Sequence, residues 1–284
     1  MISIVIIIDK VRPALNRLFN SLKDQLKEYE TEVLLIHESE TKVTLPNFDI
    51  DIKYHNIKPK QGFSYNRNKG LEFAKGEIIV FIDDDIWVHK DWLKNLVSPI
   101  LNDSLIYAVT SGTVIPKSNL IGDSISALGF PGGGSLGFEN VWKVDGDGFT
   151  DHICVGNCAL RRKIFDIVGK FDESMKSGAE DAEFSFRMDQ KGIKIKYVKE
   201  AYAFHEARDK FIPFIKWQLR RGRANFQFKK RVGNVKGFIK LRMWSAFNIL
   251  KVNKYNWRLP FIILFLGLSF MLQQIGFFLE KFNF

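Results

Sequence analysis

The sequence predicts an α/β fold in which a mostly parallel central sheet carries helices on both faces. Apolar, β-branched runs, which are typical of strands buried on both faces, alternate along the chain with stretches of helical spacing. Three of these runs end at acidic residues, and ligands of doubly wound sheets bind at the carboxyl ends of the strands. The chain of 284 residues is 46% hydrophobic and 26% charged, which excludes disordered, collagen-like and disulfide-scaffold proteins.

The first half of the chain contains the clearest strand and helix patterns. Residues 2–8 are expected to form a buried strand, because they are apolar, stop at Asp9 and lack the basic start of a signal peptide. The patterns that follow predict a helix over 13–26, a strand over 32–37, a helix over 64–75 and a strand over 78–82. Because parallel strands end at one edge of a sheet, Asp9, Glu38 and the acidic run 83–85 are expected to meet there.

The second half of the chain is less regular. Residues 111–151 are rich in glycine and turn signals and are expected to form loops and short strands. Beyond them the patterns predict a strand over 153–160, a helix over 162–168, a helix over 181–191 and a strand over 193–198. A first domain is therefore expected to end near residue 206.

Positive charge is concentrated beyond that point. The formal charge of the chain is +10, and residues 206–258 hold fifteen Lys and Arg against Glu206 and Asp209. We expect a basic amphipathic helical region over 207–258, and its charge indicates an anionic partner: nucleic acid, acidic lipid or a phosphorylated substrate.

Residues 259–279 contain no charged residue and are long enough, at about 30 Å, to cross the hydrocarbon layer of a membrane. This hydrophobic helix is predicted to be a membrane anchor, either spanning or re-entrant, or to lie in the interface; a buried core helix is the soluble alternative. Gln273 and Gln274 weaken the spanning prediction. Basic residues flank the segment at Lys251, Lys254 and Arg258, and the positive-inside tendency then places the chain on the cytoplasmic face of an anionic membrane.

The chain has two cysteines, Cys154 and Cys158. A pair four residues apart is expected to remain as reduced core thiols rather than to form a disulfide. A zinc site with His152 is the alternative, although no second Cys/His pair supplies the remaining ligands.

Asp83, Asp84 and Asp85 directly follow an apolar strand pattern. Clustered carboxylates suit Mg²⁺ or Mn²⁺, and a bound cation would relieve the repulsion among three adjacent negative charges; a solvated acidic turn is the alternative. On the preceding helix, Arg67 and Asn68 are expected to reach phosphate groups, because a guanidinium suits bidentate phosphate contact. A solvated surface charge is the alternative for Arg67.

Four motifs in order now point to a family. They are SYNRNKGLEFAKGEIIVFIDDD at 64–85, GNCALRRKIFDIVGKFDE at 156–173, GAEDAEFSFRM at 178–188 and AFHEA at 203–207. Over about residues 2–206 the chain resembles family 2 glycosyltransferases of the GT-A fold. The resemblance implies a catalytic domain over 1–206 that transfers a sugar from a nucleotide-sugar donor to an acceptor hydroxyl, with inversion at the anomeric carbon and with Mn²⁺ or Mg²⁺ as cofactor.

The resemblance also implies roles for single residues. Asp83 and Asp85 would be the ends of the DxD motif and bind the metal, and His205 would complete the metal shell. Asp181 would be the catalytic carboxylate that removes the acceptor proton, with Glu180 orienting it or binding the acceptor. The alternative for Asp181 is a helix N-cap within an acidic first turn.

Further residues would bind the nucleotide sugar. Glu38 would contact the nucleotide base, and Gly156 and Asn157 would approach the donor sugar or the acceptor. The full set implied for the nucleotide sugar is Ile8, Asp9, Glu38, Arg67, Asn68, Asp83, Asp84, Asp85, Gly156 and Asn157. Asp9 and Lys10 depart from the Pro-Thr-Tyr-Asn-like turn of many members, so UDP is expected only because it is the commonest nucleotide.

Gln218 and the arginines of QLRRGRANF partly match the QxxRW element of processive synthases, but Gly222 replaces the tryptophan. We therefore expect transfer of one or a few sugars. Arg220, Arg221 and Arg223 are expected to hold the donor diphosphate or an acceptor lipid phosphate, with a solvated surface as the alternative.

Together these features predict a membrane-associated glycosyltransferase whose acceptor is a cell-surface glycan or a lipid-linked precursor. A nucleotidyltransferase or phosphoryl hydrolase that uses the acidic triplet is a second enzyme hypothesis. A basic nucleic-acid or membrane-binding module is a third, and it leaves the acidic strand ends unexplained, so no nucleic-acid partner is expected.

Overall fold

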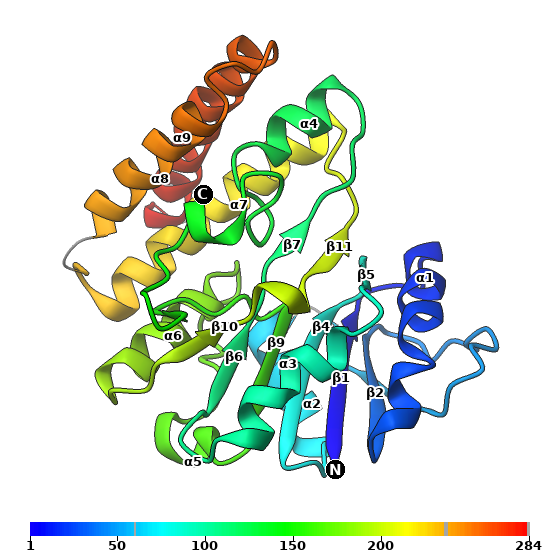
Figure 1. Cartoon of the computed structure of the whole chain (residues 1–284). Helices are drawn as coiled ribbons and strands as arrows, with labels where there is room; N and C mark the ends of the chain where they lie inside the picture. Colours follow the sequence, from blue (N-terminus) through cyan, green and yellow to red (C-terminus); the bar gives the residue numbers. More distant parts are fainter. Residues whose placement is uncertain (60, 236–237, 283–284) are drawn as a thin grey trace.

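The computed structural model describes residues 1–59, 61–235 and 238–282, and its centre is one large sheet (Figure 1). The strands of this sheet are β1 (Ile2–Ile8), β2 (Thr31–Glu38), β3 (Ile52–Ile57), β4 (Ile78–Asp83), β6 (Ala108–Thr110), β8 (Phe149–Thr150), β9 (Asn157–Arg161) and β10 (Ile195–Tyr197). They pair in the order β3-β2-β1-β4-β9-β6-β10-β8. The first four are mutually parallel, whereas β9 runs antiparallel to β4 and β6.

A smaller sheet carries one of the predicted site residues. It consists of β5 (Ile86–Val88), β7 (Thr113–Val114) and β11 (Ala203–His205) in the order β5-β11-β7. β5 begins three residues after the last residue of β4, and its pairing with β11 sets His205 opposite Ile86. The segment that contains the acidic run is thereby brought next to His205.

Helices cover both faces of the large sheet, as the sequence predicts. On one face, Ile4 and Ile6 of β1 pack in a cluster with residues of α1 (Pro13–Leu22) and α3 (Trp92–Asn102). On the other face, Val5 packs in a cluster with residues of α2 (Phe63–Phe73), α5 (Ile164–Val168) and α6 (Glu180–Gln190). Alternate residues of one apolar strand therefore serve two cores, which explains why the strand has no polar side.

Most predicted elements are confirmed within a few residues, and two are wrong in part. The helix predicted over 13–26 ends at Leu22 and is followed by a 3-10 turn at Gln25–Glu28, because the buried Gln25 side chain bonds the carbonyl of Ser21 at 2.9 Å. The strand predicted over 153–160 forms only from Asn157, after a turn closed by the Asn157 N–H bond to the Cys154 carbonyl. The sequence pattern gives no sign of its antiparallel direction.

The sequence patterns do not predict several elements. These are β3, β5, β6, β11, α3 and α4 (Leu120–Ser126). The helix α4 lies in the segment whose glycines and turn signals predict loops and short strands. The helical region expected over 207–258 contains two helices, α7 (Phe211–Val232) and α8 (Phe238–Val252), and the hydrophobic helix expected over 259–279 is α9 (Leu259–Lys281).

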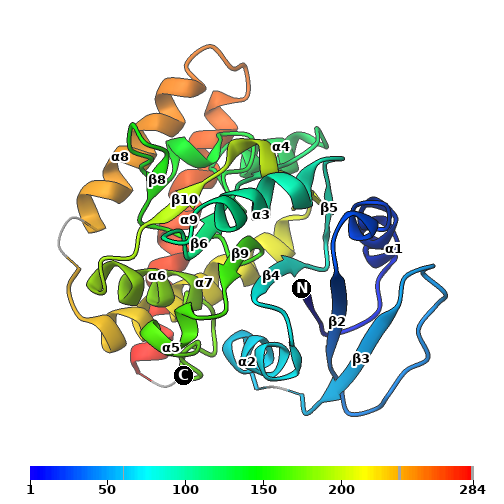
Figure 2. The ribbon, with the colours of Figure 1, turned by 60° about the horizontal axis from the view of Figure 1, so that its bottom comes forward.

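These three last helices gather at one side of the molecule, far from β3 (Figures 1 and 2). α7 and α9 run in the same direction, since Phe214 meets Phe265 at one end and Phe226 meets Phe277 at the other, each with ring centroids 5.2 Å apart. Glycines on both helices allow this contact. A Cβ at Gly276 would lie 2.1 Å from the Leu219 carbonyl oxygen.

Buried polar groups also join the two helices. The side-chain Oε1 of Gln218 accepts hydrogen bonds from Ser269 Oγ at 2.9 Å and from Gln273 Nε2 at 2.8 Å. Among the described residues, α9 is the one helix long and apolar enough to span a membrane, and a third of its apolar stretch is buried against the rest of the chain. Its remaining surface is apolar and exposed at Ile263, Leu264, Phe270 and Met271.

Enlarging the glycine at the centre of this contact should destabilise the protein. Gly276→Ala places a methyl group against α7, and we expect the free energy of unfolding to fall by about 1–3 kcal/mol, as for other overpacked interiors. Gly267→Ala is the matched control on the same helix, because a Cβ there meets nothing within 4 Å. Chemical denaturation of both variants in detergent measures the difference, and equal stability would show that the close contact does not hold α9.

Candidate active site

A cleft of about 1050 Å³ opens at the carboxyl ends of β1, β2 and β4. Its walls also include residues of α2, α6, α7, α8 and α9. The predicted site residues that line it are Ile8, Asp9, Glu38, Arg67, Asp83, Asp84, Asp85, Gly156, Glu180, Asp181, His205, Arg220 and Arg221. The parallel strands therefore bring the acidic strand ends together, as expected from the sequence.

Asp83 and Asp84 are held by different contacts, Asp83 through its backbone and Asp84 through its side chain. The Asp83 N–H bonds the Gly156 carbonyl, and a Cβ at Gly156 would lie 2.1 Å from Asp83 Oδ2, so a larger residue there would displace the Asp83 side chain. Asp84 Oδ2 lies 2.6 Å from Arg12 Nη1, and Arg12 also pairs with Asp9. Burial and the charge of Asp85 raise the pKa of Asp84 to about 7, although Arg12 opposes the shift.

Asp85 pairs with His205. Nε2 of His205 lies 3.2 Å from Asp85 Oδ1. Burial would raise the pKa of Asp85, but this contact and the charges of Arg208 and Arg12 hold it at about 2. Nδ1 of His205 lies 2.7 Å from the Glu206 carbonyl oxygen, to which it donates. Because Nδ1 is bonded to this carbonyl, Nε2 is the ring nitrogen that faces Asp85, and it is the nitrogen that a cation would bind together with Asp85.

The three predicted metal ligands do not form one group. Within the parts of the chain that the structure describes, no three His, Cys, Asp or Glu side chains are placed to hold a metal ion. Asp83 lies instead 3.8 Å from Arg67, and Asp85 and His205 remain as an open pair. Such a pair fits Mg²⁺ or Mn²⁺, because hard cations of this kind bind one or two carboxylates and complete their shell with water and substrate phosphates.

The zinc alternative has no support in the geometry. His152, Cys154 and Cys158 belong to no metal-binding group among the described residues, and both cysteines are free, as predicted. Burial raises the pKa of the Cys158 thiol to about 12, so it stays protonated at neutral pH.

Arg67 forms a buried ion pair, so the alternative of a solvated surface charge is wrong. Its guanidinium on α2 bonds the carboxylate of Glu180 at the start of α6, and both side chains are less than 10% exposed. Burial raises the pKa of Glu180, and the charge of Arg67 opposes that shift. Arg67 also lines the cleft, so it is engaged with carboxylates here, and its contact with a phosphate stays a prediction.

Asp181 is the carboxylate of this region that stays open to the cleft, with 36% of its side chain exposed. Its Oδ1 accepts the Ala182 N–H at 2.7 Å, and Ala179 is the N-cap residue, so the N-cap interpretation of Asp181 is wrong. Partial desolvation raises the pKa of Asp181. His152 Nε2 lies 3.8 Å from Asp181 Oδ2, but burial lowers the pKa of His152 to about 4, so its ring is neutral.

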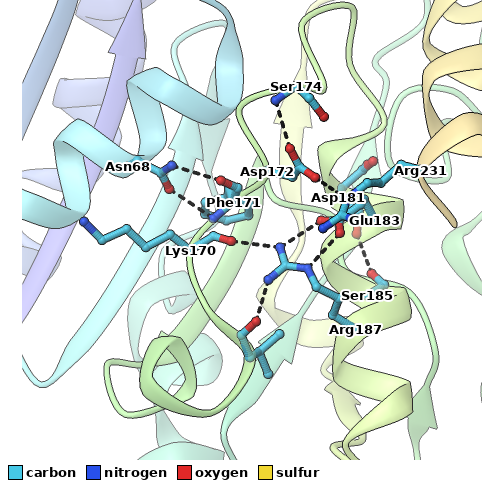
Figure 3. A network of polar contacts seen from close by, with 11 residues as sticks. Asn68, Lys170, Phe171, Asp172, Ser174, Asp181, Glu183, Ser185, Arg187 and Arg231 are labelled. Carbon is cyan, nitrogen blue, oxygen red and sulfur yellow. Dashed lines mark hydrogen bonds and ion pairs between the residues drawn. The ribbon is translucent and has the colours of Figure 1, made fainter.

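The first turns of α6 are fixed by a polar network (Figure 3). Ser185 Oγ donates to the Asp181 carbonyl at 2.7 Å, and Arg187 bonds both Glu183 oxygens at 2.8 Å. The Arg187 guanidinium also donates to the carbonyls of Val168 and Lys170. These bonds fix α6 to the segment around Val168 and Lys170, and α6 in turn positions Asp181.

The structure places Asn68, Asn157 and Arg223 outside the cleft lining. Asn68 bonds the backbone of Phe171 through both its amide nitrogen and oxygen. Asn157 accepts from Trp92 Nε1 at 2.8 Å and is buried, and Arg223 Nη1 lies 3.1 Å from Glu280 on α9. These three residues join elements of the fold.

Sequence reasoning missed two cationic residues in the cleft. Arg12 carries no motif, and its role appears only through its bonds to Asp9 and Asp84. Arg208 lies 4.5 Å from the Trp217 ring and within electrostatic reach of Asp85. The position of Arg208, three residues after His205, was the one available signal.

Removing the cation of the buried pair should cost much stability. Arg67→Leu leaves the Glu180 carboxylate buried without its partner, and we expect the free energy of unfolding to fall by about 3–5 kcal/mol. The double variant Arg67→Leu/Glu180→Leu removes both charges and should recover part of the loss. Chemical denaturation measures both, and a double variant less stable than the single one would contradict this account.

Comparison with known proteins supports the fold and family. Residues 3–168 match the model "Glycosyl transferase family 2". Among curated relatives, the chain is 30% identical over 173 residues to the glucosyl-dolichyl phosphate glucuronosyltransferase of Haloferax volcanii (55% of this chain, 51% of that protein). It is 27% identical over 173 residues to the glycosyltransferase AglE of the same organism (59% and 52%). The chain thus spans about half the length of these relatives.

Among solved structures, one similar fold is that of the mannosyltransferase PcManGT from Pyrobaculum calidifontis in complex with GDP-Man and Mn²⁺. The TM-score is 0.59 and the sequence identity is 17%, and the match covers 94% of this chain and 74% of that one. TarS of S. aureus is similar with a TM-score of 0.52 and 16% identity, over 81% and 43%. These likenesses support the GT-A fold predicted from the sequence. With its family model, strand order and acidic cleft, the chain belongs to glycosyltransferase family 2.

Proposed function

We propose that the protein transfers a sugar from a nucleotide-sugar donor to an acceptor hydroxyl with inversion at the anomeric carbon, assisted by Mn²⁺ or Mg²⁺. The observation that carries this proposal is that the Asp85–His205 pair and the partly exposed Asp181 carboxylate line the same cleft. The Asp85–His205 pair can bind a cation, and the Asp181 carboxylate can act as a base. Inverting transfer needs both a stabilised leaving group and a base for the incoming hydroxyl.

The donor end of the cleft is assigned to the strand ends. A cation held by Asp85 and His205, beside Asp83, would stabilise the charge that develops on the departing diphosphate. Arg12 and Arg208 add positive charge next to the same aspartates. Glu38 accepts bonds from the Gln61 N–H and from Asn66, which orients its carboxylate at the end of β2 for the nucleotide base.

Asp181 is the proposed general base. Its raised pKa makes it a stronger proton acceptor than an ordinary aspartate, and its exposure gives an acceptor hydroxyl access to it. Glu180 cannot serve in its place, because Arg67 holds its carboxylate. Glu180 instead fixes the start of α6, next to the base.

The proposal extends to location. The exposed apolar surface of α9 and the basic residues near it suit the cytoplasmic face of an anionic membrane, with a cell-surface or lipid-linked glycan as acceptor. The division into a catalytic domain over 1–206, a basic region over 207–258 and a hydrophobic helix over 259–279 belongs to this proposal. A UDP-sugar remains the expected donor.

A donor screen tests the function. The full chain in detergent is incubated with UDP- and GDP-sugars and Mn²⁺ or Mg²⁺, and thermal shift and nucleoside diphosphate release are measured. We expect one donor to stabilise the protein and turn over slowly. Asp181→Asn should keep donor binding and lower kcat about a hundredfold to ten-thousandfold, because it removes the base.

Two further variants separate the roles. Asp85→Ala should lose metal-dependent donor binding, whereas Asp166→Asn, a control on the exposed surface of α5, should leave binding and turnover unchanged. If Asp181→Asn turns over as fast as the unaltered protein, Asp181 is not the base. If no nucleotide sugar binds under any metal, the proposed function is wrong.

A further inference from the structure

The cleft continues beyond Asp181 into the helical side of the molecule. Its lining there comes from three helices: Arg221 of α7, Leu241, Arg242 and Ile249 of α8, and Leu266 and Phe270 of α9. These apolar side chains lie among polar ones such as Ser245, Ser269 and Gln273, and Arg221 and Arg242 bring positive charge to this part of the cleft. A donor diphosphate held at the strand ends does not account for it.

Arg221 is placed to receive an anion. Its guanidinium lies 3.7 Å from the centre of the Phe130 ring and 5.2 Å from that of Trp217, so aromatic rings pack against it. In the portion of the chain that the structure describes, its buried Nη1 has no hydrogen-bond partner. A buried guanidinium nitrogen without an acceptor is costly, and a ligand oxygen would satisfy it.

Arg242 adds a second positive charge at the same place. Its Nη2 donates to Gln273 Oε1 at 3.0 Å, which holds the side chain between α8 and α9. Burial and the charge of Arg242 lower the pKa of Arg221 to about 9, while Asp181 opposes that shift. The positive charges of the two guanidinium groups repel each other, and a bound anion would relieve this repulsion. A phosphate suits the site, because its several oxygens can accept hydrogen bonds from both groups.

Arg221 lies near Arg208, since both guanidinium groups pack against the Trp217 ring, but the carboxylates next to the two arginines differ. Arg12 and Arg208 accompany Asp84 and Asp85, whereas Arg221 accompanies Asp181, the proposed base. The acceptor must bring its hydroxyl to the base. An anion bound at Arg221 therefore belongs to the acceptor.

The apolar lining leads to the outer surface of the helices. Phe270 lines the cleft and is also 68% exposed, and Leu264 and Met271 on the same helix are exposed beside it. On α8, Met243 and Phe247 are exposed as well. An acceptor with an apolar tail can therefore keep its tail at this surface while its charged group lies in the cleft.

Resting on the proposed function, we infer that Arg221 and Arg242 form the subsite for the phosphate of an acceptor that carries an apolar tail. The phosphate would accept hydrogen bonds from the two guanidinium groups, and the tail would leave the cleft past Phe270. The sugar hydroxyl to be glycosylated would then lie at Asp181.

The test compares three probes with the full chain in a nonionic detergent, by calorimetric titration. Dodecyl phosphate has the anion and the tail, dodecanol has the tail alone, and inorganic phosphate has the anion alone. We expect dodecyl phosphate to bind about tenfold tighter, or more, than either of the others, because each of them lacks one half of the interaction. Arg221→Gln should abolish this preference.

Lys216→Gln is the matched control, since it removes one exposed cation from the same helix outside the cleft lining, and it should keep the preference. Melting temperatures of both variants show whether they fold, and the comparison of probes in the unaltered protein needs no variant. Equal binding of dodecyl phosphate and dodecanol would overturn the anion subsite. Equal binding of dodecyl phosphate and inorganic phosphate would overturn the assignment of an apolar tail.

Donor binding in the same samples separates this inference from the proposed function. If a nucleotide sugar binds but dodecyl phosphate has no advantage, the subsite is wrong and the transferase proposal stands. If dodecyl phosphate binds preferentially, Arg221→Gln loses it and no nucleotide sugar binds, the subsite stands and the proposed function is wrong.

Discussion

The cleft depends on how arginine and histidine side chains are distributed among carboxylates that would otherwise repel one another. Arg12 bonds Asp84, His205 contacts Asp85 and Arg67 bonds Glu180. In the described parts of the chain, no lysine or arginine forms an ion pair with Asp181, and its neighbour His152 is neutral at physiological pH. This asymmetry gives adjacent residues different chemistry: Glu180 is a fixed counter-ion, and Asp181 is available to accept a proton. Arg67 is central because it also lies near Asp83 and so connects the strand end to the start of α6.

The sequence predicts the position of a residue well where that position follows from the pattern of apolar residues in strands and helices. Buried parallel strands must end at one edge, so the strand pattern alone places Asp9, Glu38 and Asp83 together. The sequence is uninformative where the function of a charge depends on a partner far along the chain. Arg67 and Glu180 are 113 residues apart, and no local pattern shows that the arginine bonds this carboxylate.

The same limit applies to the C-terminal helices. Their helical character follows from the sequence, but the contact of α7 with α9 does not, because the face of α7 toward α9 includes polar and small residues such as Gln218 and Gly222, which interrupt an apolar stripe. Gln273 weakens the prediction of a membrane segment, yet it is buried and bonds Gln218 on α7 and Arg242 on α8. A polar side chain within an apolar helix here reflects contact with the rest of the protein. That contact leaves other apolar residues of α9, such as Ile263 and Phe270, exposed.

The glycine contact between α7 and α9 has a practical consequence for protein production. Removing a hydrophobic C-terminal segment is a common way to obtain a soluble enzyme, and it presumes that the segment is an appendage. Here a truncation before α9 would expose Gln218 and the backbone groove at Gly222, and it would remove Leu266 and Phe270 from the wall of the cleft. The shortened chain would have an altered active site. Solubility is better sought by exchanging exposed side chains such as Ile263 and Leu264, which lie outside the cleft lining.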